Sequence, residues 1–97
     1  MATFILLANY TDSGFRHVKD SPKRLDAARN VASKLGAQLK DFYLCMGDHD
    51  IVAIVEAPSD ETMAKFVLSL AGVGAVRTTT LKAFDEQQYR QILGELS

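Results

Sequence analysis

The feature that most constrains the fold is a short polar stretch, Gly47-Asp48-His49-Asp50, which lies between two apolar runs. The flanking runs, Leu39–Met46 and Ile51–Ala57, are rich in residue types that favour β-strands. Gly and Asp readily adopt the backbone conformations that tight turns require. The stretch therefore predicts a β-hairpin in the middle of the chain, with one further strand and helix on each side.

Before the hairpin, Thr3–Tyr10 has the composition of a strand, and the polar segment Thr11–Asp20 is expected to form a loop. Ser21-Pro22 predicts a helix start, with the Ser21 hydroxyl as cap and proline at the first helical position. Gly36 would end this helix. Four residues form its apolar stripe: Leu25, Ala28, Ala32 and Leu35. Four charged residues lie off the stripe and are expected to face solvent: Lys23, Arg24, Arg29 and Lys34.

After the hairpin, Pro58-Ser59-Asp60 predicts the start of a second helix that ends at Gly72 or Gly74. Its buried face would comprise Met63, Phe66, Val67 and Leu70. The run Ala75–Phe84 is typical of a fourth strand. Asp85 with Gln88 forms a capping-box pattern for a last short helix. The apolar stripe of that helix would comprise Tyr89, Ile92, Leu93 and Leu96.

The resulting order is β-α-β-β-α-β plus a terminal helix. This order predicts an α+β fold, a ferredoxin-like sandwich whose four-stranded antiparallel sheet has strand order 4-1-3-2. At 97 residues the chain is expected to form a single domain, 1–97, with both main helices on one face of the sheet.

Both faces of this predicted sheet are apolar. The first strand has Phe4, Leu6 and Ala8 on one side and Ile5 and Leu7 on the other. The third strand has Ile51, Ala53 and Val55 against Val52 and Ile54. In the second strand the alternation places Leu39, Tyr43 and Cys45 opposite Phe42, Leu44 and Met46. Since two helices cover only one face, we expect a homodimer or a higher homo-oligomer that associates through the sheet faces.

Composition excludes several classes of partner. The net charge is −1, from 11 basic and 12 acidic side chains. The chain therefore lacks the excess of positive charge that binding to nucleic acid or to an anionic membrane requires. No apolar run approaches the roughly 20 residues of a membrane span. One cysteine, Cys45, is consistent with a cytoplasmic location, because it cannot form an internal disulfide.

Two segments resemble a known family. The stretch from Met46 to Pro58, MGDHDIVAIVEAP, is similar to the signature of the GYD-domain family, and Gly74–Phe84 resembles its Thr-rich final strand. One departure is that His49 stands where the family has Tyr before the aspartate. The resemblance implies a dimeric α/β barrel of the ferredoxin-like class and little about activity. More distantly, the pattern is similar to the ligand-sensing domain of Lrp/AsnC regulators, in which small effectors bind at subunit interfaces.

In strand order 4-1-3-2, the end of the first strand lies beside the starts of the third and fourth. The sheet end near the hairpin is therefore predicted to gather a polar group of residues: Asn9, Tyr10, Asp48, His49, Asp50 and Arg77. This group is a candidate ligand site, although turn stabilisation by the two aspartates and pairing of Arg77 with a carboxylate would also explain it. Glu56 lies on the same strand face as Val52 and Ile54 and is a further candidate, because its carboxylate would point toward an apolar layer. The alternative is that this carboxylate reaches solvent.

No cofactor and no metal site are expected, because the spacing of His49, Asp48, Asp50 and Cys45 matches no zinc pattern. The leading hypothesis is a dimeric, non-catalytic small-molecule-binding or regulatory module, with its ligand at the barrel mouth or subunit interface. The alternative is a small cofactor-independent oxygenase or isomerase of the dimeric α/β-barrel class. Such an enzyme would hold an ionisable group such as Glu56, Tyr43 or His49 inside the barrel.

Overall fold

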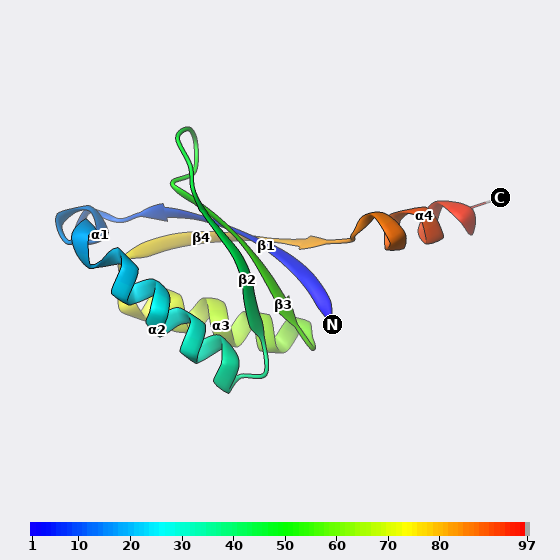
Figure 1. The fold of residues 1–97 in the computed structure, drawn as a ribbon, viewed down its shortest axis with the longest axis horizontal. Helices are drawn as coiled ribbons and strands as arrows, with labels where there is room; N and C mark the ends of the chain where they lie inside the picture. Colours follow the sequence, from blue (N-terminus) through cyan, green and yellow to red (C-terminus); the bar gives the residue numbers. More distant parts are fainter. Residues whose placement is uncertain (97) are drawn as a thin grey trace.

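The computed structural model describes residues 1–96 (Figure 1). Its elements are, in order, β1 (Ala2–Tyr10), α1 (Asp12–Arg16), the 3-10 helix η1 (Val18–Asp20), α2 (Ser21–Lys34), β2 (Gln38–Leu44), β3 (Ile51–Ala57), α3 (Asp60–Val73), β4 (Val76–Ala83) and α4 (Glu86–Gly94). The four strands form one antiparallel sheet in the order β2-β3-β1-β4. Read from the other edge, this order is the predicted 4-1-3-2, so the ferredoxin-like fold is confirmed.

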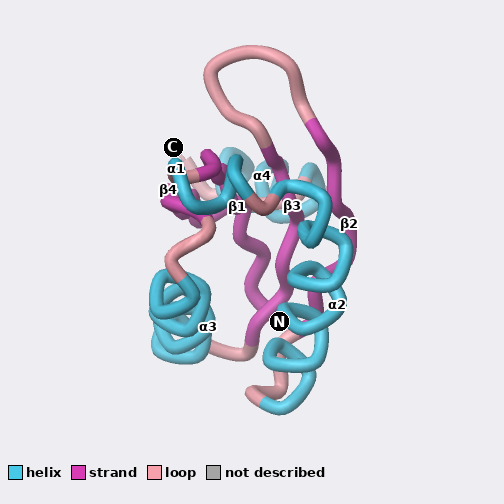
Figure 2. Tube along the Cα trace, turned by 90° about the vertical axis from the view of Figure 1, so that its left-hand side faces the viewer, coloured by secondary structure: helices cyan, strands magenta, loops and turns pink. Residues whose placement is uncertain are grey.

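Helices α2 and α3 lie on the same side of the sheet (Figure 2). We call the covered side the front face and the opposite side the back face. The core forms between the helices and the front face, where Phe4, Leu6, Ala53 and Val55 pack with other buried residues. On the helices the core residues include Ala32, Met63 and Phe66. This arrangement confirms the predicted faces of β1 and β3 and the predicted buried face of α3.

The prediction for β2 was partly wrong. A bulge shifts the β2–β3 register between Leu39 and Asp41. As a result Leu39, opposite Val55, and Phe42, opposite Ala53, both pack against the core. Simple alternation places these two side chains on opposite faces, because it cannot anticipate an extra residue in one strand.

The hairpin is also longer than a tight turn. The chain between β2 and β3 projects away from the helices (Figure 1), and the Cys45 N–H donates to the Asp50 carbonyl at 2.8 Å to close it.

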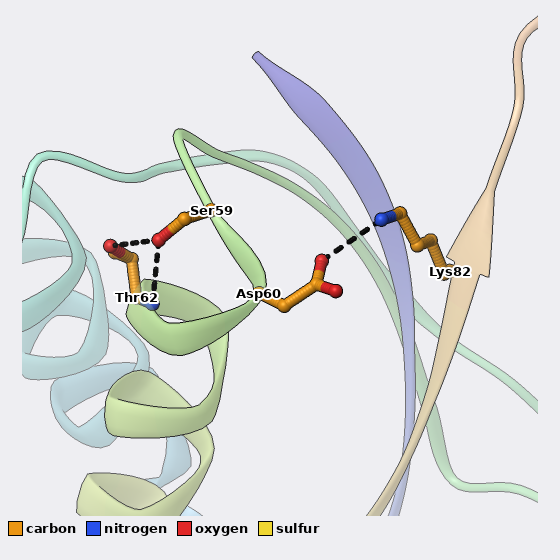
Figure 3. A network of polar contacts seen from close by, with 4 residues as sticks. All are labelled: Ser59, Asp60, Thr62 and Lys82. Atoms are coloured by element: carbon orange, nitrogen blue, oxygen red, sulfur yellow. Dashed lines mark hydrogen bonds and ion pairs between the residues drawn. The ribbon is translucent and has the colours of Figure 1, made fainter.

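Helix α3 begins and ends as the sequence predicts. The Ser59 side chain caps it by accepting a hydrogen bond from the Thr62 N–H at 3.2 Å (Figure 3). One residue later, Asp60 accepts a hydrogen bond from Lys82 Nζ of β4 at 3.0 Å, which ties the start of the helix to the sheet. The helix ends at Gly74, whose φ of 81° is in the left-handed region that suits glycine.

The start of α2 differs from the prediction. Its N-cap is Asp20, whose side chain makes no capping hydrogen bond, and Ser21 is already helical. The Ser21 hydroxyl instead forms a hydrogen bond of 3.0 Å with the Tyr10 hydroxyl. The Ser21 side chain, which the local sequence assigns to capping, is therefore bonded to a residue far away in the sequence.

The segment predicted as a loop, Thr11–Asp20, contains α1 and η1. Thr11 caps α1 by accepting a hydrogen bond from the Gly14 N–H at 3.1 Å, and its own hydroxyl donates to the Gly74 carbonyl at 2.6 Å. Gly14 packs so tightly against Ala75 that a Cβ there would overlap the Ala75 carbonyl oxygen. Absence of a side chain at this position therefore lets α1 close against the start of β4.

Helix α4 extends away from the rest of the chain (Figure 1). The capping box of Asp85 and Gln88 is present as predicted. Its apolar side chains contact no core, and Tyr89 is 56% exposed. None of the helices in residues 1–96 is long and apolar enough to cross a membrane.

The contact of Gly14 with Ala75 generates a stability prediction. Gly14→Ala should lower the free energy of unfolding by about 1–3 kcal/mol, because the backbone must move to admit the methyl group. In thermal denaturation this corresponds to a fall of about 4 °C or more in Tm. Gly72→Ala is the matched control, since no atom beyond its chain neighbours and its own helix backbone lies within 4 Å of the place that its Cβ would occupy, and alanine favours the helix. Equal Tm values for the two variants would contradict the proposed close approach.

Candidate functional site

The predicted polar group lies at the hairpin end of the sheet, and three of its members interact. The Asp50 carboxylate accepts a hydrogen bond from the Tyr10 N–H at 3.0 Å. The Asp50 N–H in turn donates to the Asn9 side-chain oxygen at 3.0 Å and to the Ala8 carbonyl at 3.0 Å. These bonds satisfy main-chain groups where β1 and β3 stop pairing. Asp50 and Asn9 therefore hold the strand ends together.

The other members of the group are less enclosed. Asp48 and His49 lie in the hairpin, where Asp48 is exposed and His49 is half-buried. Arg77 pairs in register with Asn9 across β1 and β4 and is also exposed. It belongs to none of the ion pairs found within residues 1–96, so these residues give no support to the alternative explanation in which Arg77 pairs with a carboxylate.

Glu56 lies apart from the polar group. It pairs in register with Thr3 and Gln38, at the opposite end of the sheet from Asp50. Its carboxylate lies 3.7 Å from the Lys40 Nζ atom, and its side chain is 33% exposed. The structure therefore does not bring Glu56 together with the hairpin residues, and the carboxylate reaches a cation at the surface.

A cavity of about 220 Å³ lies on the front face, between the sheet and helices α2 and α3. Its walls are mainly apolar, with contributions from both helices and from the strands: Leu25, Ala28, Phe42, Leu70, Val73 and Val76. Five polar side chains also line it: Tyr10, Ser21, Arg24, Ser69 and Thr78. A second hollow shares Tyr10 and Ser21 and continues toward Val18 and Leu44.

The polar side of the cavity is built by α1, η1 and the first turn of α2. The Tyr10 ring packs at a centroid distance of 5.2 Å from Phe15 of α1, and its hydroxyl bonds to Ser21. Arg24 donates from Nη1 to the His17 carbonyl at 3.1 Å, which holds the guanidinium beside the segment before α2. Its Nη2 atom is buried and has no hydrogen-bond partner within residues 1–96.

The sequence prediction for Arg24 was wrong. The helical pattern places Arg24 on a solvated face with Lys23, yet Arg24 is half-buried and lines the cavity. A signal for this position exists in the sequence. Arg24 precedes Ala28 by four residues, so it lies one turn before the apolar stripe and continues it. Ser21, three residues earlier, lies on the same side.

Comparison with known proteins identifies the family. The family model described as GYD domain matches residues 4–93. The chain belongs to the GYD domain family. This result confirms the family resemblance of the hairpin and final-strand segments. A Thermus thermophilus relative named "Glutamine synthetase and cystathionine beta-lyase binding protein" is 34% identical over 84 residues, which cover 86% of this chain and 88% of the relative.

Solved structures with the same fold include a regulatory protein. MtbAldR matches with a TM-score of 0.68 at 19% identity. A feast or famine regulatory protein from M. tuberculosis, complexed with L-methionine, matches with a TM-score of 0.67 at 15% identity. Each match covers 88% of this chain but only 54% and 51% of the two other chains, so this chain spans about half their length. At these identities the likeness concerns the fold.

A third structure, TTHA0845 from Thermus thermophilus, has a TM-score of 0.57 at 25% identity, with 88% of this chain and 95% of that chain covered. The same fold therefore also occurs in a protein of this chain's size.

The side chains that line the cavity limit the chemistry that it can support. Among the described residues that line the cavity, none carries a carboxylate, an imidazole or a thiol. In the part of the chain that the structure describes, no group of three or more His, Cys, Asp or Glu side chains could hold a metal ion. The cavity offers apolar surface, hydroxyls such as those of Tyr10 and Ser21, and one guanidinium.

The contacts of Asp50 predict a structural role at the hairpin end. Asp50→Ala should lower the free energy of unfolding by about 1–3 kcal/mol, because the Tyr10 N–H loses its acceptor. Asp48→Ala is the control, since Asp48 is exposed, and its free energy of unfolding should stay within about 0.5 kcal/mol of the original value. Urea denaturation measures both free energies. An Asp50→Ala variant as stable as Asp48→Ala would contradict the role.

Proposed function

We propose that this chain is a homodimeric, non-catalytic binding module that acts by associating with metabolic enzymes and with a small molecule. The observation that carries the proposal is the large apolar surface that the core does not use. Residues 1–97 would act as one domain, in the cytoplasm, without a nucleic-acid or membrane partner. The argument for each interaction rests on a different face of the sheet.

The back face supports self-association. It presents Ile5, Leu7, Val52 and Ile54, which are only half-buried, together with exposed Leu81. Monomeric proteins rarely expose a continuous apolar patch of more than a few hundred Å². At about 25 cal/mol per Å², covering such a patch of ~400 Å² would contribute on the order of 10 kcal/mol. A second copy related by a two-fold axis supplies a complementary surface of the same kind.

Helix α4 gives further support. Its stripe of Tyr89, Ile92 and Leu93 is exposed, although the helix has a complete capping box. A short amphipathic helix gains most of its stability from packing its apolar side against another element. Since α4 extends away from its own sheet (Figure 1), its apolar stripe would pack against the partner protomer.

The lining of the cavity supports binding over catalysis. A cofactor-independent oxygenase or isomerase in the barrel interior requires a positioned general base. Glu56 pairs with Lys40 outside the cavity, and Tyr43 and His49 are not among its lining residues. The three side chains that the sequence offers as a base for the alternative enzyme therefore lie outside the described lining of the cavity.

The polar hairpin end is the surface proposed for a protein or polar ligand. Asp48, His49 and Arg77 lie there, and Asn9, Tyr10 and Asp50 fix the strand ends beneath them. The relative named for binding glutamine synthetase and cystathionine beta-lyase suggests the kind of partner. Polar, accessible side chains suit a reversible contact with such an enzyme.

Self-association can be tested with one exposed back-face residue. Leu81 is 45% exposed in the single chain, so Leu81→Lys should fold but place a charge in the dimer interface. Sedimentation velocity at micromolar concentration should give a dimer for the unmodified chain and a monomer for Leu81→Lys. Leu68→Lys, at a position 71% exposed on α3, is the matched control and should remain dimeric. A monomeric unmodified chain would refute the proposal.

Association with enzymes can be tested by titration calorimetry with purified glutamine synthetase and cystathionine beta-lyase from the same organism. The unmodified dimer should bind at least one of them. Asp48→Lys should weaken that binding by about tenfold, because it reverses a charge at the proposed contact. Asp26→Lys makes the same change on α2, away from the hairpin, and should bind normally. Absence of binding to both enzymes would exclude these two partners.

A further inference from the structure

We infer that the front-face cavity is a binding site for a small monocarboxylate with an unbranched apolar tail of about six to eight carbons. The inference deepens the proposed binding function by naming a ligand class. It does not depend on the dimer, because the cavity lies within one chain and on the side of the sheet away from the back face.

The size of the cavity limits the ligand. A volume of 220 Å³ exceeds the ~150 Å³ apolar cavity that holds benzene and is smaller than the ~300–1,000 Å³ typical of drug-sized ligand sites. At about 30 Å³ for each water-sized group, it holds roughly seven such groups. Apolar walls from Leu25, Ala28, Leu70 and Val73 favour methylene groups over water.

The guanidinium of Arg24 defines the charge of the ligand. Its Nη2 atom is buried without a hydrogen-bond partner within residues 1–96, whereas Nη1 already donates to the His17 carbonyl. A buried charged donor without a partner is costly. No Asp or Glu is among the described residues that line the cavity. The missing acceptor is therefore expected from a ligand that carries a negative charge.

A carboxylate fits this position best. Arginine binds carboxylates through short, charge-assisted hydrogen bonds. Ser21 and Arg24 are three residues apart on α2, so their side chains are neighbours, and the Tyr10 hydroxyl is bonded to Ser21. These two hydroxyls and one guanidinium can accommodate two oxygens. A phosphate monoester carries close to two negative charges, and the single positive charge of Arg24 would neutralise only one of them.

Ligand length provides the first test, by calorimetric titration of the unmodified protein with butanoate, hexanoate and octanoate. Affinity should rise by about fourfold for each methylene that enters the cavity. Octanoate should bind more tightly than octan-1-ol and octyl phosphate. Failure of octanoate to bind at about 10 mM, where even weak small-ligand binding is measurable, would overturn the inference. Tighter binding of octyl phosphate would overturn the assignment of a carboxylate.

Paired variants locate the site. Arg24→Met keeps an apolar stem and should weaken octanoate binding by at least about tenfold, with octan-1-ol unaffected. Arg29→Met, at an exposed position of the same helix, should leave both affinities unchanged. Ala28→Leu should fill the cavity and weaken both ligands. Equal octanoate affinities for Arg24→Met and Arg29→Met, or an unaffected Ala28→Leu protein, would overturn the site.

The monomeric variant separates this inference from the proposed function. Leu81→Lys should bind octanoate with the affinity of the unmodified chain, because Leu81 pairs with Ile5 on the opposite face. Loss of octanoate binding in this variant would contradict a site within one chain. Absence of octanoate binding in a protein that still dimerises and binds its enzymes would remove this inference alone.

Discussion

The structure depends on one geometric constraint, which is that two helices cover only one face of a four-stranded sheet. Helices α2 and α3 bury the front-face residues of β1 and β3, including Phe4 and Val55. The same strands carry aliphatic residues such as Ile5 and Ile54 on the back face, where they are only half-buried and neither α2 nor α3 covers them. The single chain thus buries its core on the front face and leaves apolar side chains accessible on the back face. This division is why we place self-association on one face and a small ligand on the other.

Local sequence signals predicted the order of elements because each one is determined by nearby residues. The Ser59 cap, the left-handed Gly74 and the capping box of Asp85 all depend on neighbours within a few positions. The strand order followed from this element order, since crossover connections allow few topologies. The candidate site was predicted in part for the same reason. Antiparallel register brings Asn9 and Asp50 together once the strands are known.

The remaining features depend on contacts between distant residues. A bulge in β2 turned Leu39 toward the core, and no residue near it marks the irregularity. Ser21 bonds to Tyr10 instead of capping its helix, which requires β1 to end beside the start of α2. Arg24 resembles an ordinary surface charge until the cavity beside it is known. The cavity itself results from the spacing of two helices and could not be derived from either one.

Tyr10 belongs to two arrangements through two different groups. Its main-chain N–H is held by Asp50 at the hairpin end, and its phenol meets Ser21 at the polar side of the cavity. Exchange of the ring alters only the second arrangement, since every residue except proline offers the same N–H. Substitution of the Tyr10 side chain in evolution can therefore change ligand preference without loosening the junction of β1 and β3.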